Sequence, residues 1–293
     1  MRPKTFELFR PTTVDEAVVI LATHAPDVRV LAGGQSLMPM MKLRLAAPER
    51  LVDLMKVTDL QGITREGDGT VVIGSMTTHD AVANSDLLLD YMPVLVEAAT
   101  HIGDMQVRNR GTMGGSCCQF LSESDYPPVL TMLEAEFEVR GASGTRRVPA
   151  VDFFDSALVT AVKDGELLTA IRIPGLAPHT GGAHDKVSRR FNDFGLISGS
   201  ALVTLDDSGR AIDVRIALGN AAPRPARVPS VEAALSGQVI TDELVAAAVT
   251  RIGDDINPAT DNHATADYRR KIAPSLVGRL VRTAILRAKG AQA

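Results

Sequence analysis

The alternation of apolar and polar positions near the N-terminus predicts a small unit that mixes helices and strands. Thr13 and Glu16 have the spacing of a capping box, in which a hydroxyl and a carboxylate satisfy the first backbone N–H groups of a helix. Ala17, Val18 and Leu21 then fall on one face of that helix. The predicted elements are this helix to Ala22, a strand over 28–31, a helix over 38–45 and a strand over 51–54. We assign them to a first unit, residues 1–56.

The next stretch, residues 57–176, predicts a second unit with short strands before and after a set of helices. Thr78 is placed to cap one helix, and Pro93 has the position of a proline that opens another. Gly141 to Gly144 separates two β-like runs, which is a hairpin signal. The expected elements are strands over 62–65 and 71–74, helices over 80–83 and 94–102, hairpin strands over 137–140 and 146–149, and a strand over 167–173.

A boundary is expected at 175–182, because Pro178, Gly181 and Gly182 interrupt any regular pattern there. The remaining residues, 177–293, predict three antiparallel strands followed by helices that cover one face of the sheet. Pro274 should break or kink the last helix. The predicted elements are strands over 186–190, 196–205 and 211–219, and helices over 242–251 and 267–289; the arginines at 269, 270, 279, 282 and 287 are expected to form a solvated face or, alternatively, to touch a partner subunit. The fold class is therefore α+β.

Composition narrows the function by exclusion. The chain has 293 residues, 45% of them hydrophobic, and a net charge of only −4, which gives no electrostatic reason to bind nucleic acid or an anionic membrane. It contains no apolar run long enough for a membrane span, and the N-terminal residues lack the apolar core of a secretory signal. We therefore expect a cytoplasmic protein.

The cysteines and histidines predict no metal site in this chain. Cys117 and Cys118 are adjacent, so they make a poor disulfide and cannot hold zinc or an iron–sulfur cluster on their own. We expect them to be small packing residues, with a redox role as the alternative. His79 and His101 have no second ligand at metal spacing and are expected to cap helices or pack. No spacing indicates paired carboxylates or a nucleophile with its base, so no catalytic residue is assigned.

Two glycine pairs are the strongest candidates for a binding site. Gly33-Gly34 follows the predicted strand over 28–31, and Gly114-Gly115 lies in a second segment of the same type. Glycine permits φ > 0 and lets backbone N–H groups approach an anion closely. Each pair alone is commonly a plain turn. Two such loops together, each with a serine, are what a diphosphate requires, while the absence of a G-x-G-x-x-G pattern gives no support to a Rossmann site.

Asp125 has two open roles. It lies beyond the second loop, where its carboxylate could accept a hydrogen bond from a ribose or ribityl hydroxyl. It also precedes a helix that starts at Tyr126, so it could be the N-cap of that helix. Both roles can hold at once.

These residues resemble those of a known family, the FAD-binding medium subunits of molybdenum hydroxylases, which include carbon monoxide, quinoline, nicotine-pathway, caffeine and xanthine dehydrogenases. The resemblance covers essentially the whole chain in order and spacing. It is specific for the family and not for the substrate. It is carried by Ala32-Gly33-Gly34-Gln35-Ser36, by Lys42-Leu43-Arg44-Leu45, by the run from Val107 to Ser116, by Asp125-Tyr126-Pro127-Pro128 and by the run from Glu166 to Pro174.

The resemblance implies a fold and a set of cofactor contacts. The fold would be the two-subdomain FAD-binding fold of the vanillyl-alcohol oxidase and p-cresol methylhydroxylase type, followed by a C-terminal domain like that of the carbon monoxide dehydrogenase flavoprotein. Phe194 stands where relatives often carry tyrosine, Gln35 where some carry histidine, and Ser116 where asparagine is frequent. The residues implied to bind FAD are Ala32, Gly33, Gly34, Gln35, Ser36, Leu37, Thr112, Gly114, Gly115, Ser116, Asp125, Leu168 through its backbone, Lys186 and Phe194.

The resemblance also implies a role in electron transfer. Substrate would be hydroxylated at a molybdopterin centre in a large subunit, and electrons would pass through [2Fe–2S] clusters of a small subunit to FAD in this chain. They would leave to an external acceptor such as a quinone or NAD, in an assembly expected to be a dimer of heterotrimers. A self-sufficient FAD-dependent oxidoreductase with its own substrate is the alternative, and a flavin-free binding or assembly protein is a third reading. The sequence does not name the substrate.

Overall fold

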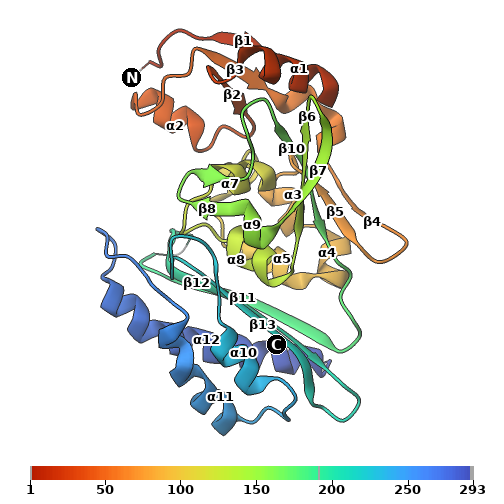
Figure 1. The fold of residues 1–293 in the computed structure, drawn as a ribbon, viewed down its shortest axis with the longest axis vertical. Coiled ribbons are helices and arrows are strands. Elements are labelled where there is room, and N and C mark those ends of the chain that lie inside the picture. Colours follow the sequence, from red (N-terminus) through yellow and green to blue (C-terminus); the bar gives the residue numbers. More distant parts are fainter. Residues whose placement is uncertain (1, 191, 291–293) are drawn as a thin grey trace.

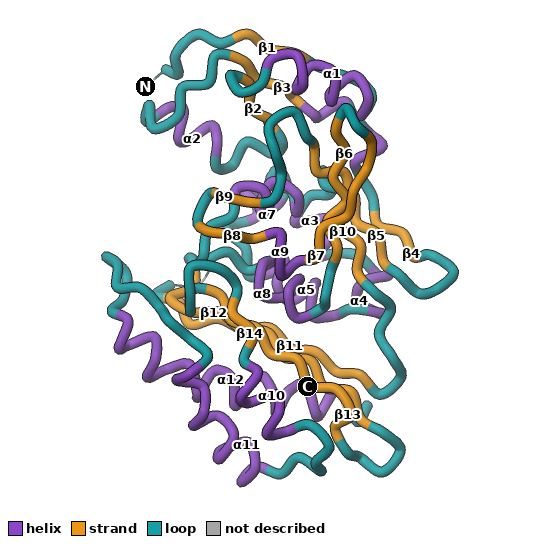
Figure 2. Tube along the Cα trace, viewed as in Figure 1, coloured by secondary structure: helices purple, strands orange, loops and turns teal. Residues whose placement is uncertain are grey.

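The computed structural model describes residues 2–190 and 192–290 and arranges them as three units stacked along the longest axis of the molecule (Figure 1). Each unit has its own sheet, and each sheet falls within one of the three spans expected from the sequence. Figure 2 shows that helices separate the sheets of the second and third units. The fold is α+β, as predicted. None of the described helices has the length and apolarity that crossing a bilayer requires.

The first unit is a three-stranded parallel sheet in the order β1-β3-β2, with α1 packed on it through Ala17, Val18 and Leu21. The predicted cap is confirmed, because the Thr13 hydroxyl accepts a hydrogen bond from the Glu16 N–H at 3.2 Å. Glu16 reaches back to the N–H of Thr12 instead of Thr13. The elements are β1 (Glu7–Phe9), α1 (Val14–His24), β2 (Val28–Leu31), α2 (Leu37–Lys42) and β3 (Arg50–Asp53).

Helix α2 is shorter than the sequence predicts. It ends at Lys42, and Arg44 has a φ of 61°, in the left-handed region where a helix cannot continue. The apolar pattern of 38–45 therefore overstates the helix by three residues. This early end leaves Leu43 and Leu45 exposed.

The second unit is built on an antiparallel sheet in the order β4-β5-β10-β6-β7. The predicted hairpin is confirmed, with Gly141 opposite Gly144 at its turn. Stacked and edge-on phenylalanines at 137, 153 and 154 pack its core. The strands are β4 (Ile63–Arg65), β5 (Val71–Gly74), β6 (Glu136–Gly141), β7 (Gly144–Pro149), β10 (Leu167–Ile173) and a separate pair, β8 (Phe154–Ser156) and β9 (Val159–Thr160). The α-helices are α3 (His79–Ala83), α4 (Asp86–Tyr91), α5 (Pro93–Thr100), α6 (Met105–Arg108), α7 (Met113–Gln119), α8 (Tyr126–Met132) and α9 (Ala150–Phe153).

The third unit is an antiparallel sheet with helices on both faces. One face carries the C-terminal helices, and the other face packs on α5 and α8 of the second unit. The three expected long strands are present, and a two-residue strand adds a fourth. The elements are β11 (Thr180–Ser188), β12 (Gly195–Leu205), β13 (Ala211–Gly219), β14 (Ala226–Arg227), α10 (Pro229–Leu235), α11 (Asp242–Ala248), a 3₁₀ turn (Val249–Asp254) and α12 (Ala266–Ala288).

Two glycines expected at the boundary lie inside a strand instead. Gly181 and Gly182 belong to β11 and pair with β12. A Cβ at Gly181 would lie 2.1 Å from the carbonyl oxygen of Ala284, so glycine is needed there for α12 to approach the sheet. Helix α12 runs through Pro274 without a break.

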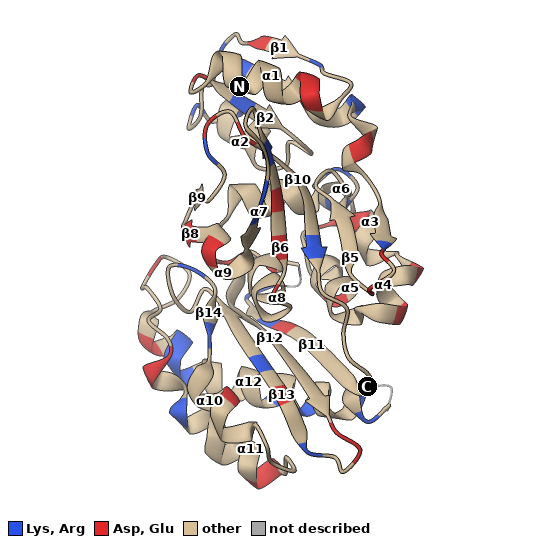
Figure 3. Cartoon of the chain, turned by 45° about the vertical axis from the view of Figure 1, so that its right-hand side comes forward, with Lys and Arg blue, Asp and Glu red and all other residues tan. Residues whose placement is uncertain are grey.

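The solvated face that the sequence predicts for the arginines of α12 is present at Arg270, Arg279 and Arg282, which are exposed, but the prediction is wrong for two others. Arg269 is fully buried, and its guanidinium donates to the carbonyls of Leu196 at 2.7 Å and Ala264 at 3.1 Å and pairs with Asp261 at 2.7 Å. Arg287 pairs with Glu97 of the second unit. The pattern misleads because a guanidinium is compatible with burial when each N–H finds an acceptor. In the view of Figure 3, basic and acidic residues are interspersed over all three units.

Removal of the buried guanidinium should destabilise the protein. Arg269→Leu leaves buried carbonyls without donors, and we expect a loss of about 3 kcal/mol in the free energy of unfolding. The neighbouring Arg270 is half exposed and pairs only with Asp267, so Arg270→Leu should change stability by less than about 0.5 kcal/mol. Urea unfolding of both variants measures this. Equal effects at the two positions would contradict the role assigned to Arg269.

Candidate functional site

A pocket of about 370 Å³ lies where the three units meet. The first unit contributes the loop between β2 and α2, the second contributes α7 and the turns around it, and the third contributes the end of β11 and the turn that follows. The wall of this pocket is therefore built from residues of all three units, which are far apart in the sequence. The pocket is lined by Val30, residues 32–37, His79, Ile102, Gly103, Val107, Gly111, Thr112, Gly115, Ser116, Gln119, Leu121, Ser124, Asp125, Lys186 and residues 192–194.

The first glycine loop presents an uninterrupted run of free backbone donors. No described residue accepts a hydrogen bond from the N–H groups of residues 33–37, although all five residues line the pocket. Gly34 has a φ of 73°, which favours glycine and turns the chain into α2. Converging N–H groups of this kind form a concave anion site. This part of the sequence-based prediction agrees with the structure.

The second glycine segment has a different role from the one expected. It forms the helix α7, which begins after Thr112, and the Thr112 hydroxyl accepts the N–H of Gly115 at 3.0 Å. The N–H of Gly114 donates to the Ser75 carbonyl at 2.9 Å, and the N–H of Ser116 donates to the Thr112 carbonyl at 3.0 Å. These amides are already satisfied. The expectation that this segment offers several N–H donors and needs φ > 0 is therefore wrong, because helix capping uses the donors.

Glycine is required in this segment for close packing. A Cβ at Gly114 would lie 2.6 Å from both Cβ and the carbonyl oxygen of Ser75, so Gly114 lets α7 sit against the end of β5. Gly114 faces this contact and does not line the pocket. A Cβ at Gly115 would reach 3.4 Å from Ala32 of the first loop.

The two glycine segments meet at one point, as the sequence predicts. A Cβ at Gly33 would lie 1.9 Å from the carbonyl oxygen of Arg110 and 2.7 Å from Cα of Gly111. The backbones of the first and second units are therefore in direct contact there. This contact places the free amides of the first loop beside Ser116 and Thr112 in the same pocket.

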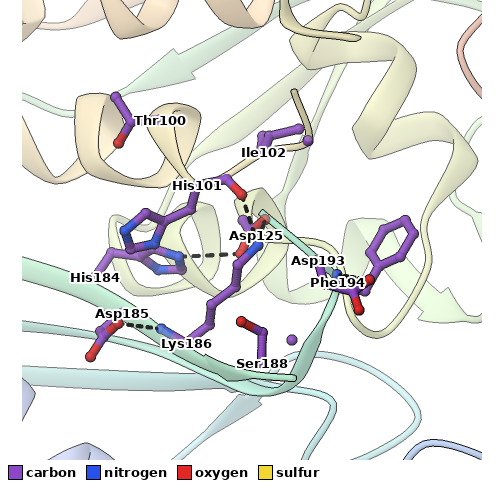
Figure 4. A network of polar contacts seen from close by, with 12 residues as sticks. Thr100, His101, Ile102, Asp125, His184, Asp185, Lys186, Ser188, Asp193 and Phe194 are labelled. Carbon is purple, nitrogen blue, oxygen red and sulfur yellow. Dashed lines mark hydrogen bonds and ion pairs between the residues drawn. The ribbon is translucent and has the colours of Figure 1, made fainter. Parts of the chain in front are cut away.

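Asp125 points away from the helix that it was expected to cap. Its backbone is helical and its side chain caps no N–H of α8. The carboxylate is held by the third unit instead, with Oδ2 3.0 Å from the Lys186 ammonium (Figure 4). The capping role proposed for Asp125 is therefore wrong, and its place in the pocket wall remains.

The other carboxylate oxygen of Asp125 lies near a second basic side chain, that of His184. His184 Nε2 is 3.5 Å from Asp125 Oδ1, and Figure 4 shows the imidazole directed at it. Burial opposes the ionisation of Asp125, but His184 and Lys186 outweigh it, so the pKa of Asp125 lies below its usual value. Asp125 is therefore a buried carboxylate anion in the wall of the pocket.

Lys186 is fixed from two sides. Its ammonium also donates to the carbonyl of His101 at 2.9 Å, and its side chain is nearly inaccessible to solvent. The strand that carries it is anchored to the second unit by Glu97, which accepts the N–H of His184 at 2.9 Å and pairs with Arg287. Docking of the third unit therefore sets the position of the ammonium in the pocket.

Phe194 and Leu168 differ in how they relate to the pocket. Phe194 lies at the pocket edge with 58% of its surface exposed, so it provides an uncovered aromatic face. Leu168 is buried in β10 opposite Val139 and is not among the lining residues. The sequence missed other lining residues, among them Ile102, Gly103 and Ser124, because an apolar residue, a turn glycine or an isolated serine carries no specific chemical signal in one sequence.

The cysteines fit the expected packing role. Cys117 is buried inside α7, and burial raises its pKa; it also raises the pKa of Cys118 to about 12. Both thiols therefore stay protonated and weakly nucleophilic. Within residues 2–190 and 192–290, no three metal-ligating side chains come together.

The geometry defines a class of site: an anion cradle of backbone amides, an adjacent hollow at a junction of three units, and a lysine–aspartate pair in its wall. Residues 4–176 match the family described as FAD binding domain in molybdopterin dehydrogenase, and residues 183–284 match the CO dehydrogenase flavoprotein C-terminal domain. The chain belongs to the family of FAD-binding medium subunits of molybdenum hydroxylases.

Relatives with different activities match over nearly the whole chain. The carbon monoxide dehydrogenase medium chain of Hydrogenophaga pseudoflava is 39% identical over 97% of this chain and 98% of that protein. The caffeine dehydrogenase subunit beta of Pseudomonas sp. (strain CBB1) is 34% identical over 96% of this chain and 95% of that protein.

Solved structures agree with the same assignment. A carbon monoxide dehydrogenase chain from Hydrogenophaga pseudoflava superposes with a TM-score of 0.94 at 39% identity and covers 98% of this chain and 99% of its own. A chain of quinoline 2-oxidoreductase from Pseudomonas putida 86 superposes with a TM-score of 0.93 at 30% identity, again over 98% and 99%. The fold expected from the resemblance is confirmed.

The contact between the glycine segments can be tested directly. Gly33→Ala places a Cβ against the Arg110 carbonyl, so the two backbones must separate and the amide cradle must move away from Ser116. We expect FAD affinity to fall roughly tenfold or more, about 1.4 kcal/mol. Titration of the FAD-free chain with FAD, followed by flavin fluorescence, measures this. Gly67→Ala, in an open turn with nothing within 4 Å, is the matched control, and equal affinity of both variants would contradict the assignment.

The lowered pKa of His79 should make the free energy of unfolding depend on pH. Burial lowers the pKa of His79 from 6.5 to about 4. Between these values the unfolded chain binds a proton there that the folded chain does not, so acidification should destabilise the fold. The loss should approach roughly 3 kcal/mol near the folded pKa.

The comparison of urea unfolding near neutral pH and at about pH 5 measures this effect. His79→Gln has no group that titrates at this position, so it should lose less stability than the natural chain over the same interval. Parallel losses in the two proteins would show that other groups cause the acid sensitivity.

Proposed function

We propose that this chain is the electron-exit module of its complex, in which FAD bound in the pocket takes electrons from a partner and passes them on. The observation that supports this most directly is the run of five free amides at residues 33–37. A diphosphate offers the oxygen acceptors that such a cradle lacks within the protein. FAD supplies the redox chemistry when bound, and the chain supplies orientation and electrostatics.

The remaining pocket residues have complementary roles in this proposal. Ser116 and Thr112 border the cradle, and Ala32 and Gly115 form a wall without bulky side chains. Lys186 and Asp125 form a buried ion pair in the pocket wall, so together they supply a fixed dipole instead of a net charge. Phe194 presents an aromatic ring that has no hydroxyl group. It can therefore pack against the flavin but cannot form a hydrogen bond with it.

A self-sufficient oxidoreductase would need its own acid or base beside the flavin. Among the described residues, the titratable groups on the pocket wall are His79, Asp125, Lys186 and Asp193. Asp125 and Lys186 neutralise each other, His79 stays neutral because of its low pKa, and the Asp193 carboxylate accepts the N–H of Phe194 at 2.9 Å. This arrangement supports electron transfer without substrate chemistry in the chain itself.

Partner subunits follow from the family. The relatives are medium chains of multi-subunit molybdenum hydroxylases, so a large and a small subunit accompany this chain. We propose that the large subunit carries molybdopterin, that the small subunit carries the [2Fe–2S] clusters, and that two heterotrimers associate in the cytoplasm. The external acceptor would be a quinone, NAD or a similar carrier.

In this proposal the large subunit, and not this chain, determines which substrate the complex oxidises. Relatives named for carbon monoxide, caffeine and nicotine match over 97%, 96% and 92% of this chain, respectively. A shared flavin module with such different substrates is expected if the substrate pocket lies on the large subunit. Carbon monoxide, purines and N-heteroaromatic compounds remain candidates.

Mixing the purified full chain, loaded with FAD, with the chemically reduced iron–sulfur subunit tests the proposal. We expect the flavin absorption band to bleach when the reduced partner is added, while candidate substrates leave the isolated chain oxidised. Bleaching of the isolated chain by one of those substrates would instead establish the self-sufficient oxidoreductase. A chain that stays colourless after incubation with FAD would exclude both.

A further inference from the structure

We propose that His79 is a further cofactor-binding residue: a neutral imidazole that donates its Nε2–H to an oxygen of the FAD diphosphate. This inference rests on the proposed binding of FAD in the pocket. It assigns chemistry to a histidine that the sequence pattern presented only as a capping or packing residue.

The backbone holds His79 at the junction of the two glycine segments. His79 is the first residue of α3, directly after the cap Thr78, and its N–H donates to the carbonyl of Gly111 at 2.9 Å. His79 is 4% exposed as a whole residue, so its side chain occupies a defined position in the pocket wall. Its place is therefore tied to the same segment that contacts the first loop.

The edge of the ring that carries Nε2 faces Gly111. A Cβ at Gly111 would lie 2.7 Å from both Cδ2 and Nε2 of His79, so any larger residue at position 111 would collide with this edge of the ring. Gly111 also adjoins Gly33, the first residue of the free-amide run, because a Cβ at Gly33 would lie 2.7 Å from Cα of Gly111. His79 Nε2 and the amide cradle therefore border the same small region, which favours the diphosphate as the shared acceptor.

The hydrogen bond at the other ring nitrogen fixes the tautomer. His79 Nδ1 is 3.2 Å from the hydroxyl of Tyr126, and no other described residue accepts that hydroxyl proton. Burial raises the pKa of Tyr126 well above its usual value, so the phenol keeps its proton. Tyr126 therefore donates to Nδ1, and the imidazole hydrogen lies on Nε2.

This Nε2–H has no acceptor within the described chain. The Tyr126 contact is the one hydrogen bond that the imidazole makes in residues 2–190 and 192–290. A donor on a pocket wall that lacks a protein acceptor is available to a ligand oxygen.

The surrounding charges keep the imidazole neutral. Burial lowers its pKa to about 4; Asp125 acts to raise it and Arg108 acts to lower it further, and the packed Tyr126 is uncharged. His79 is therefore a donor without positive charge over the whole physiological range.

Two substitutions separate the two ring nitrogens. In His79→Gln the side-chain amide reaches the position of Nε2, and in His79→Asn it reaches only the position of Nδ1, where it can still contact Tyr126. We expect the Gln variant to bind FAD within about threefold of the natural chain and the Asn variant to bind roughly tenfold more weakly. Flavin fluorescence titration of the FAD-free full chain measures both affinities, and thermal unfolding without FAD measures the structural effect of each change.

Equal FAD affinity of the Asn variant and the natural chain would overturn the proposal. It would also be overturned if both variants lost affinity in proportion to their loss of thermal stability, because the ring would then act by packing alone. Nitrogen NMR of the natural chain tests the tautomer without any variant; a proton on Nδ1 would contradict the assignment. If the natural chain itself failed to bind FAD, the proposed function would fall, whereas tight binding by the natural and Asn chains alike would remove only the role of His79.

Discussion

The structure depends on one backbone contact, between Gly33 of the first unit and Arg110-Gly111 of the second. No Cβ fits between them, so the two units meet at a distance that only glycine allows. The contact is short enough to fix the orientation of the first loop. As a result, five amides from one unit and the start of a helix from another face the same hollow.

Each of the three units contributes a different group to the pocket. The backbone N–H groups of the first loop are free because this loop is neither strand nor helix. The first N–H groups of α7 are used within the protein, and α7 presents the small residue Gly115 to the pocket. The third unit brings a cation, and Asp125 of the second unit holds that cation through a buried ion pair. Buried pairs contribute more to specific positioning than to stability. The pocket is thus completed only when all three units are docked.

The sequence predicted the elements well where the signal was local. The capping box at Thr13, the strand over 28–31 and the hairpin around Gly141 follow from neighbours in the chain, and the structure confirms them. Failures arose where distant residues decide. Asp125 looks like an N-cap until Lys186 is seen 61 positions away, and Arg269 looks exposed until its acceptors are seen. Gly114 and Gly115 were assigned to a loop because glycine permits φ > 0 and close approach to an anion, yet both lie in α7, where Gly114 packs against Ser75.

The site residues, too, could be predicted where the signal is local and not where it depends on long-range contacts. The resemblance named nearly all of the pocket residues on the two loops, since their motifs are contiguous. It gave no reason to choose His79, whose position depends on a contact with Gly111 and a hydrogen bond to Tyr126. Leu168 was included for its backbone, and its side chain is buried in the core.

Amide hydrogen exchange, measured residue by residue with and without FAD, tests the central claim most directly. If the first loop alone supplies the backbone donors, FAD should slow exchange at residues 33–37 and leave residues 114–116, whose amides are already bonded within the protein, almost unchanged. Slowed exchange at 114–116 with no change at 33–37 would contradict the account.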